Sequence, residues 1–233
     1  MKSLNQMNWN KKFTYPPSTR ALIENQRHYE VGKEKLPSVT TILEATQPSE
    51  KKESLANWRR KVGEKEADRI RDHAAERGTI MHRVIEGHLL GHRHADLSDL
   101  GQQAGRMAQN IIESGLKGSL DEIWGSEIVV YYPGLYAGAT DLAGIYEGRE
   151  SIIDFKQSNR LKRREWITDY FLQLAGYTVA HNVVHGTKIQ RGVILMCTAD
   201  NIYQRFIVQD KEFQKYMWEW LRRVDKFYDT RNN

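Results

Sequence analysis

The sequence predicts an α/β or α+β fold, with a central sheet flanked by helices and a helical N-terminal region. Three observations predict it. Residues 50–91 are rich in charge and have helical periodicity. Between residues 120 and 208, short apolar runs are separated by turn residues, as strands are. After Asp210, large apolar side chains recur at helical spacing. Elements in this order bury a sheet against helices.

The first residues differ in composition from the rest of the chain. Residues 1–26 are polar and contain Tyr15-Pro16-Pro17-Ser18, so they predict a mobile or loosely docked arm. We expect a single domain over residues 27–233. Its first part, residues 27–118, is expected to be mainly helical, and residues 119–233 are expected to hold the sheet core.

A short strand and a short helix are expected next. Residues 27–31 alternate weakly and precede Gly32, which indicates a strand and a turn. Ser38 is placed to cap a short helix that reaches Leu43. Because a helix N-terminus attracts anions, Ser38 and Thr40 are also candidates for contact with a phosphate, although capping alone is the simpler interpretation.

The charged helical region contains one mixed aromatic and basic stretch, Asn57-Trp58-Arg59-Arg60-Lys61. Trp58 and Arg59 there suit base stacking and phosphate neutralisation. The alternative is a solvated helix with Trp58 packed inward, and the sequence supports both equally.

A break is expected at Arg77-Gly78-Thr79, with Thr79 capping a new helix over residues 80–90. On that helix His82 and Glu86 are four residues apart and share one face. Four further histidines have no zinc-site partners at usable spacing and are interpreted as surface residues: His73, His88, His92 and His94.

A further amphipathic helix is expected over residues 96–117, with three apolar side chains toward the core: Met107, Ile111 and Ile112. Residues 126–132 form the first strong strand. Two apolar runs, 138–146 and 151–156, then flank a polar turn and predict a β-hairpin.

Alternation along the second strand of that hairpin places Asp154 and Lys156 on the same side. Antiparallel pairing brings Asp141 alongside them. Two carboxylates and an ammonium group in one place suit a hard divalent cation, which prefers oxygen ligands, with a lysine beside its bound water.

Four cations follow in a predicted loop, where they are placed to hold a substrate backbone: Arg160, Lys162, Arg163 and Arg164. A solvated surface is the alternative for such a run. A helix over residues 165–185 carries Gln173 and Tyr177 at i and i+4. Two strands, 190–197 and 202–208, and a final helix over residues 210–228 complete the chain.

Composition narrows the functional classes. The chain has 35 basic and 30 acidic residues, for a net charge of +5, which suits a polyanionic partner without requiring one. A single cysteine, Cys197, excludes an internal disulfide framework and a four-cysteine iron–sulfur cluster. The apolar runs are too short for a membrane span. The first residues lack the apolar stretch of a signal peptide, so a reducing, intracellular setting is expected.

Several of these residues form an ordered set of motifs: Gly78-Thr79-x-x-His82, Glu127, Gly138-x-x-Asp141, Asp154-x-Lys156 and Gln173-x-x-x-Tyr177. The set resembles the RecB-like branch of the PD-(D/E)xK nuclease superfamily. The upstream stretch from Leu36 to Leu43 resembles the corresponding part of the mitochondrial genome maintenance exonucleases and their phage relatives. Two positions depart from the family pattern: Thr140 replaces the proline of the superfamily name, and Gln157 replaces a small hydroxyl residue.

The resemblance implies a restriction-endonuclease-like mixed sheet and a metal site. In it Asp141, Asp154, the backbone carbonyl of Phe155 and His82 would bind one or two Mg²⁺ or Mn²⁺ ions. Lys156 would orient or deprotonate the attacking water. The remaining residues would support the site or the substrate: Glu86 and Glu127 in a second metal site or beside the ligands, and Gln173, Tyr177 and Gln157 at the substrate strand.

By the same resemblance, the expected activity is metal-dependent hydrolysis of DNA from a free end, on single strands. A structure-specific or restriction-type endonuclease is one alternative, and a catalytically silent nucleic-acid-binding module of the same fold is another. No iron–sulfur cluster is expected. Replication or recombination proteins are the expected partners, and the cytoplasm of a bacterium or of a phage-infected host is favoured over the mitochondrial matrix.

Overall fold

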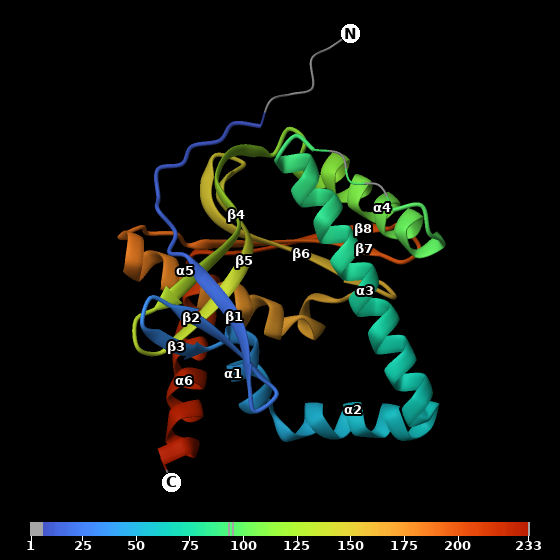
Figure 1. Cartoon of the computed structure of the whole chain (residues 1–233), viewed down its shortest axis with the longest axis horizontal. Helices are drawn as coiled ribbons and strands as arrows, with labels where there is room; N and C mark the ends of the chain where they lie inside the picture. The colour runs from blue at the N-terminus through green and yellow to red at the C-terminus, as the bar shows by residue number, and fades with distance from the viewer. Residues whose placement is uncertain (1–6, 93, 95, 233) are drawn as a thin grey trace.

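The alternating apolar runs after residue 119 form a five-stranded sheet (Figure 1). The computed structural model describes residues 7–92, 94 and 96–232. The strands lie in chain order: β4 (Leu120–Tyr132), β5 (Tyr136–Tyr146), β6 (Arg149–Ser158), β7 (Arg191–Thr198) and β8 (Tyr203–Gln209). β6 and β7 are parallel and the other neighbours are antiparallel, so the sheet is mixed, as expected.

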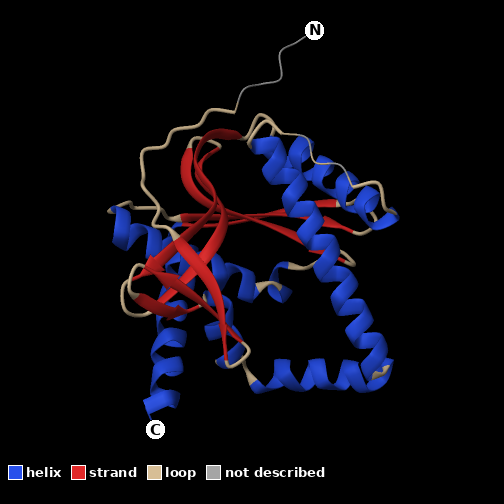
Figure 2. Cartoon of the chain, viewed as in Figure 1, coloured by secondary structure: helices blue, strands red, loops and turns tan. Residues whose placement is uncertain are grey.

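Helices cover both faces of this sheet (Figure 2). α3 (Glu64–Leu89), α4 (Asp99–Ile111) and the π-helical turn after it (Ile112–Leu116) pack on one face. On the other face lie α5 (Thr168–His185), which connects the parallel strands β6 and β7, and α6 (Asp210–Asn232). A 3₁₀ turn (Arg164–Trp166) precedes α5. Each face therefore has its own apolar core, and the predicted α+β class is confirmed.

Residues 7–26 of the expected mobile or loosely docked arm pack on the domain. Strand β1 (Ser18–Ile23) pairs with β2 (Gln26–Val31), which pairs with β3 (Glu34–Pro37). Before β1, the backbone around Asn10 forms hydrogen bonds with β4. The rings of Phe13 and Tyr15 pack on the core beside α5, in contact with His181. Although this segment is polar overall, its aromatic side chains supply enough apolar surface for docking. Residues 1–6 of the predicted arm lie outside the described residues.

Two further helices connect the small sheet to α3. α1 (Val39–Ala45) begins as predicted, because the Ser38 side chain accepts a hydrogen bond from Thr41 N. α2 (Ser49–Val62) follows, and none of its residues is buried. No helix of the described residues combines the length and the apolar character needed to span a membrane.

The predicted break in the long helical region is wrong. α3 continues through Arg77, Gly78 and Thr79, and the Thr79 hydroxyl bonds to the backbone carbonyl of Ala75 rather than capping a new helix. Glycine weakens a helix by about 1 kcal/mol, which packing overrides here. A Cβ at Gly78 would lie 3.4 Å from the Gln157 side chain, an ordinary contact distance, so α3 packs against β6 at this point.

Candidate metal centre

The candidate site lies where two neighbouring strands part. The pairing of β5 with β6 ends at Leu142 and Ile153, and the predicted hairpin is confirmed up to that point. Asp141 and Asp154 are the next residues on the two strands. Beyond the last pair, the backbone N–H of Phe155 donates a 2.6 Å hydrogen bond to Asp141 Oδ2. The Asp141 carboxylate thus accepts the backbone hydrogen bond that a paired strand would otherwise accept.

Alternation along β6 separates its polar and apolar side chains. Ile153 and Phe155 pack in the core beneath α3 and α4. Asp154 and Lys156 point to the opposite side and form an ion pair with each other. Asp154 is only 2% exposed, so its carboxylate is held away from water beside the ammonium group.

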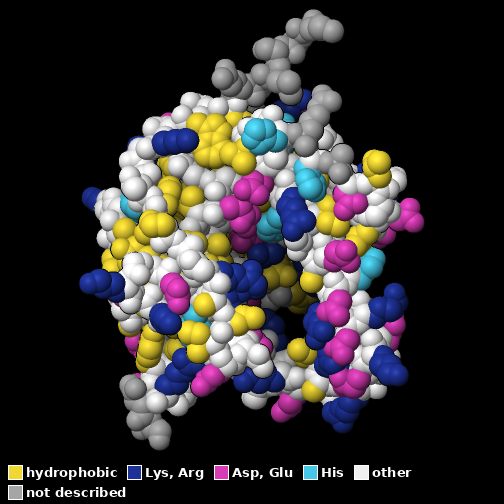
Figure 3. Space-filling model, in the orientation of Figure 1, with side chains coloured by type: hydrophobic (Ala, Val, Ile, Leu, Met, Phe, Trp, Pro, Cys, Tyr) yellow, Lys and Arg dark blue, Asp and Glu magenta, His cyan; other side chains and the backbone are white. Residues whose placement is uncertain are grey.

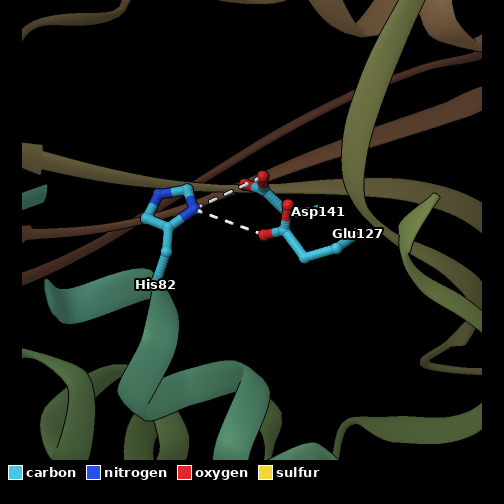
Figure 4. Close-up of side chains that lie close together, drawn as sticks. All are labelled: His82, Glu127 and Asp141. Atoms are coloured by element: carbon cyan, nitrogen blue, oxygen red, sulfur yellow. Dashed lines mark ion pairs between the residues drawn. The ribbon is translucent and has the colours of Figure 1, made fainter. Parts of the chain in front are cut away.

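His82 reaches the same point from α3 (Figure 4). Its Nδ1 atom lies 3.4 Å from Asp141 Oδ1 and 3.7 Å from Glu127 Oε1. Its Nε2 atom lies 2.9 Å from the carbonyl oxygen of Phe155. His82, Glu127 and Asp141 each offer one donor atom, and these atoms all lie within 4.8 Å of one another. Two carboxylates and an imidazole form a donor set that suits a divalent first-row ion or magnesium.

Glu127 is held in this group by an unusual backbone conformation. It lies within β4 but has a φ angle of 52°, in the left-handed region that non-glycine residues rarely adopt. Such a conformation costs about 1–3 kcal/mol and persists where the surrounding structure imposes it, often at functional sites. The sequence predicted Glu127 as a supporting residue or a ligand of a second metal, whereas the geometry places it directly beside His82 and Asp141.

The cluster strongly favours a charged imidazole. Burial disfavours protonation of His82, but Asp141 and Glu127 outweigh burial and raise its pKa to about 10. Burial likewise opposes ionisation of Asp141, yet His82 and Lys156 hold the pKa of that carboxyl below its ordinary value. Burial and the Glu127 charge together raise the pKa of Glu86, which follows His82 by four residues on α3.

The Asp154–Lys156 pair differs from the His82–Asp141 pair, because here the pKa of the carboxyl is raised rather than lowered. Burial raises the pKa of Asp154 to about 6, although Lys156 opposes the shift. Burial also disfavours the charged form of Lys156, but Asp154 and Asp141 outweigh it and keep its pKa above the ordinary value. Lys156 is therefore an ammonium group at neutral pH, suited to donate hydrogen bonds rather than to accept a proton.

Gln173 and Tyr177 brace the sheet beneath these carboxylates. Gln173 donates a 2.7 Å hydrogen bond to the Tyr177 hydroxyl. Burial and the Asp154 charge raise the pKa of Tyr177, in keeping with its place next to the site. A Cβ at Gly138 would lie 2.5 Å from the Tyr177 ring, so the glycine of the Gly138-x-x-Asp141 motif makes room for that ring.

Gln157 joins β6 to α3 in this structure. Its side chain donates to the carbonyl of Ala74 and accepts from the guanidinium of Arg77, which also bonds to Asn159. Arg77 is buried, and burial lowers the pKa of its guanidinium. The sequence prediction of Gln157 as a substrate contact did not include this link, although Arg77 stands next to the Gly78-Thr79 motif.

Four other residues predicted to contact substrate have partners within the protein. The hydroxyls of Ser38 and Thr40 lie 2.9 Å apart, and Ser38 also caps α1. Arg59 and Arg164 form ion pairs with nearby glutamates. These contacts leave substrate binding by the four residues as a prediction.

A separate group of cations gathers after β6. Burial first, and then the charges of Arg160 and Lys51, lower the pKa of Lys162. Lys51 comes from α2 and forms an ion pair with Asp169 at the start of α5. The sequence predicted Arg160 and Lys162 as phosphate contacts but missed Lys51, because nothing in the sequence near position 51 indicates that α2 crosses to α5.

Comparison with known proteins identifies relatives of one kind. No protein-family model matches the chain. The mouse mitochondrial genome maintenance exonuclease 1 is 29% identical over 210 residues, which cover 85% of this chain and 60% of the mouse protein. The human protein of the same name is 24% identical, with the same coverage. The resemblance predicted from the motifs is confirmed, and the chain spans about 60% of the length of these relatives.

A solved structure of a candidate exonuclease from Eubacterium rectale is also similar. It is 16% identical, with a TM-score of 0.48, and the match covers 66% of this chain and 64% of that one.

The electrostatics of this cluster predict a pH effect on stability. The pKa of His82 rises from 6.5 to about 10 on folding, so its contribution is complete below pH 6.5 and is lost as the pH rises toward 10. In the presence of a chelator, the free energy of unfolding of the native protein minus that of His82→Asn should therefore shrink between pH 6.5 and 10. Denaturant unfolding at several pH values measures it, and a constant difference would contradict the assignment.

Proposed function

We propose that this protein is a metal-dependent DNA exonuclease that hydrolyses phosphodiester bonds. One observation carries the proposal: the donor atoms of His82, Glu127 and Asp141 converge beside the buried Asp154–Lys156 pair. The names of the mitochondrial relatives support exonuclease activity. A phosphodiesterase site needs a cation to bind the phosphate and a group to hold the attacking water, and this arrangement offers both.

The donor set fits a divalent cation. Carboxylate oxygens suit Mg²⁺ and Mn²⁺, and the imidazole shifts the preference toward Mn²⁺. When bound, the ion would polarise the scissile phosphate and acidify a coordinated water. The charged His82 faces the Asp141 carboxylate and would lose its proton on becoming a ligand. We propose His82, Glu127 and Asp141 as ligands, with Asp154 completing the site.

Lys156 supplies positive charge at the reacting phosphate. Because its pKa is raised, it would hold the attacking water and offset charge on the phosphorus, rather than remove a proton. Asp154 keeps the ammonium group in place through their ion pair. The sequence left open whether Lys156 orients or deprotonates the water, and the surroundings of Lys156 favour the first role.

A hollow beside the site supports a single-stranded substrate. Figure 3 shows the hollow with acidic and histidine side chains above it and Lys and Arg side chains around it, in the place that α2 and α3 frame in Figure 1. α2 has no buried residue and is tied to the start of α5 by the Lys51–Asp169 ion pair. We propose that Lys51, Arg160 and Lys162 bind the strand backbone, and that Trp58, 37% exposed on α2, contacts bases.

Substitution of the buried pair tests the chemistry. Asp154→Asn and Lys156→Met should each lower the rate of cleavage of an end-labelled oligonucleotide by at least about 100-fold in Mg²⁺ or Mn²⁺, because each removes charge at the reacting phosphate. Circular dichroism and oligonucleotide binding should change little.

Matched controls are Asp200→Asn and Lys211→Met, which alter exposed residues outside the site and should retain the native rate. Full activity in either Asp154→Asn or Lys156→Met would refute the assignment.

The requirement for a free end is tested with a circle. We propose that the strand enters the hollow end first, so the enzyme should degrade linear single-stranded DNA and leave the same sequence intact when it is circular. A gel time course with both substrates measures this. Opening of the circle by the native protein, but not by Asp154→Asn, would instead identify an endonuclease, and failure to cleave either substrate would favour a silent binding module.

A further inference from the structure

Trp166 is an exposed aromatic residue in the turn between the proposed catalytic lysine and α5. It ends the 3₁₀ turn before α5 and is 52% exposed, which is high for a side chain of this size. The next residue, Ile167, is buried and anchors the turn in the core. The backbone at Trp166 is therefore fixed while the indole ring remains open to solvent.

A cation contacts the ring, and its guanidinium also lies 4.0 Å from the Glu165 carboxylate. The guanidinium carbon of Arg163 lies 5.3 Å from the centre of the Trp166 ring system, a cation–π contact. Lys162 and Arg160 precede it in the same loop. An exposed aromatic ring flanked by cations is the combination that binds single-stranded nucleic acid, because the ring stacks on a base while the cations neutralise the phosphates.

Trp166 is also connected to the reaction site through α5. Four residues later, Tyr170 places its ring under Lys156, with the ammonium nitrogen 5.2 Å from the ring centre. The Tyr170 N–H donates a 2.9 Å hydrogen bond to the carbonyl of Ile167, the residue after Trp166, so the turn that carries Trp166 is joined to the first turn of α5. Asp169, which lies between them in the chain, forms an ion pair with Lys51 of α2, so this turn lies beside the hollow that α2 helps to frame.

We propose that Trp166 is a base-stacking site for a nucleotide next to the scissile phosphate. This inference rests on the proposed function and names the group that recognises the substrate. Stacking on one tryptophan face is tolerant of sequence, since every base has a π-face. The site would therefore require bases to be present and unpaired, without selecting among them.

A comparison of normal and abasic strands separates stacking from backbone binding. The background is Asp154→Asn with Ca²⁺, in which strands are bound without being degraded, and fluorescence anisotropy reports the affinity. The two strands are a labelled 20-residue oligothymidylate and a strand of equal length and charge whose sugars carry no bases. The variants are Trp166→Ala, which removes the aromatic ring, and Trp166→Phe, which keeps one.

Trp166→Ala should weaken binding of the oligothymidylate by about 5- to 150-fold, the usual range for loss of one stacked base. Trp166→Phe should retain most of the affinity. On the abasic strand, Trp166→Ala should change the affinity less than about 2-fold, because no base is present to stack. Trp218→Ala is the matched control, since Trp218 is 68% exposed on α6, and it should alter neither affinity.

An equal loss on both strands, or no loss on the oligothymidylate, would overturn the inference. The outcome is independent of the proposed activity. If the native protein cleaves DNA but Trp166→Ala does not weaken binding of the oligothymidylate, base stacking alone is refuted. A protein whose binding depends on Trp166 and on bases, but that cleaves no DNA in Mg²⁺ or Mn²⁺, would refute the exonuclease function alone.

Discussion

Asp141 holds the site together because its two carboxylate oxygens bond in different directions. Oδ2 accepts the backbone N–H of Phe155 on the neighbouring strand, and Oδ1 faces the imidazole of His82 on α3. One side chain thereby fixes the point at which β5 and β6 part and the distance of α3 from the sheet. The separation of the strands leaves the space in which a cation and a phosphate can be bound.

The rest of the fold supports that geometry from both faces. On the face covered by α3, Arg77 and Gln157 join that helix to β6 close to Lys156. On the face covered by α5, Tyr177 packs over Gly138 and lies near Asp154. These contacts explain why the glycine of one motif is needed: Gly138 lies where the Tyr177 ring approaches the backbone too closely for a larger side chain.

Much of this arrangement follows from the sequence, where the signal is local. Two-residue periodicity placed Asp154 and Lys156 on one face, and the polar turn between the two apolar runs predicted the hairpin that aligns Asp141 with them. The Ser38 cap and the final helix were predicted for the same reason. Each depends on residues that are close together in the chain.

What the sequence missed depends on distant contacts. Gly78 was expected to end a helix, but its packing against Gln157 overrides its weak helix propensity. The left-handed backbone of Glu127 is imposed by its neighbours in the sheet and has no sequence signature. The docking of residues 7–17 depends on a few aromatic side chains in a polar stretch, and the approach of Lys51 to α5 depends on the path of α2.

We propose that His82, Glu127 and Asp141 form a divalent metal site, and Mn²⁺ binding tests this most directly. Electron paramagnetic resonance of free Mn²⁺ gives the bound fraction as protein is added. The native protein should remove the free-ion signal at a defined stoichiometry, and Asp141→Asn should bind at least about 10-fold more weakly, because it loses one charged oxygen ligand. Equal binding by Asp141→Asn and the native protein, or no binding by either, would contradict the account.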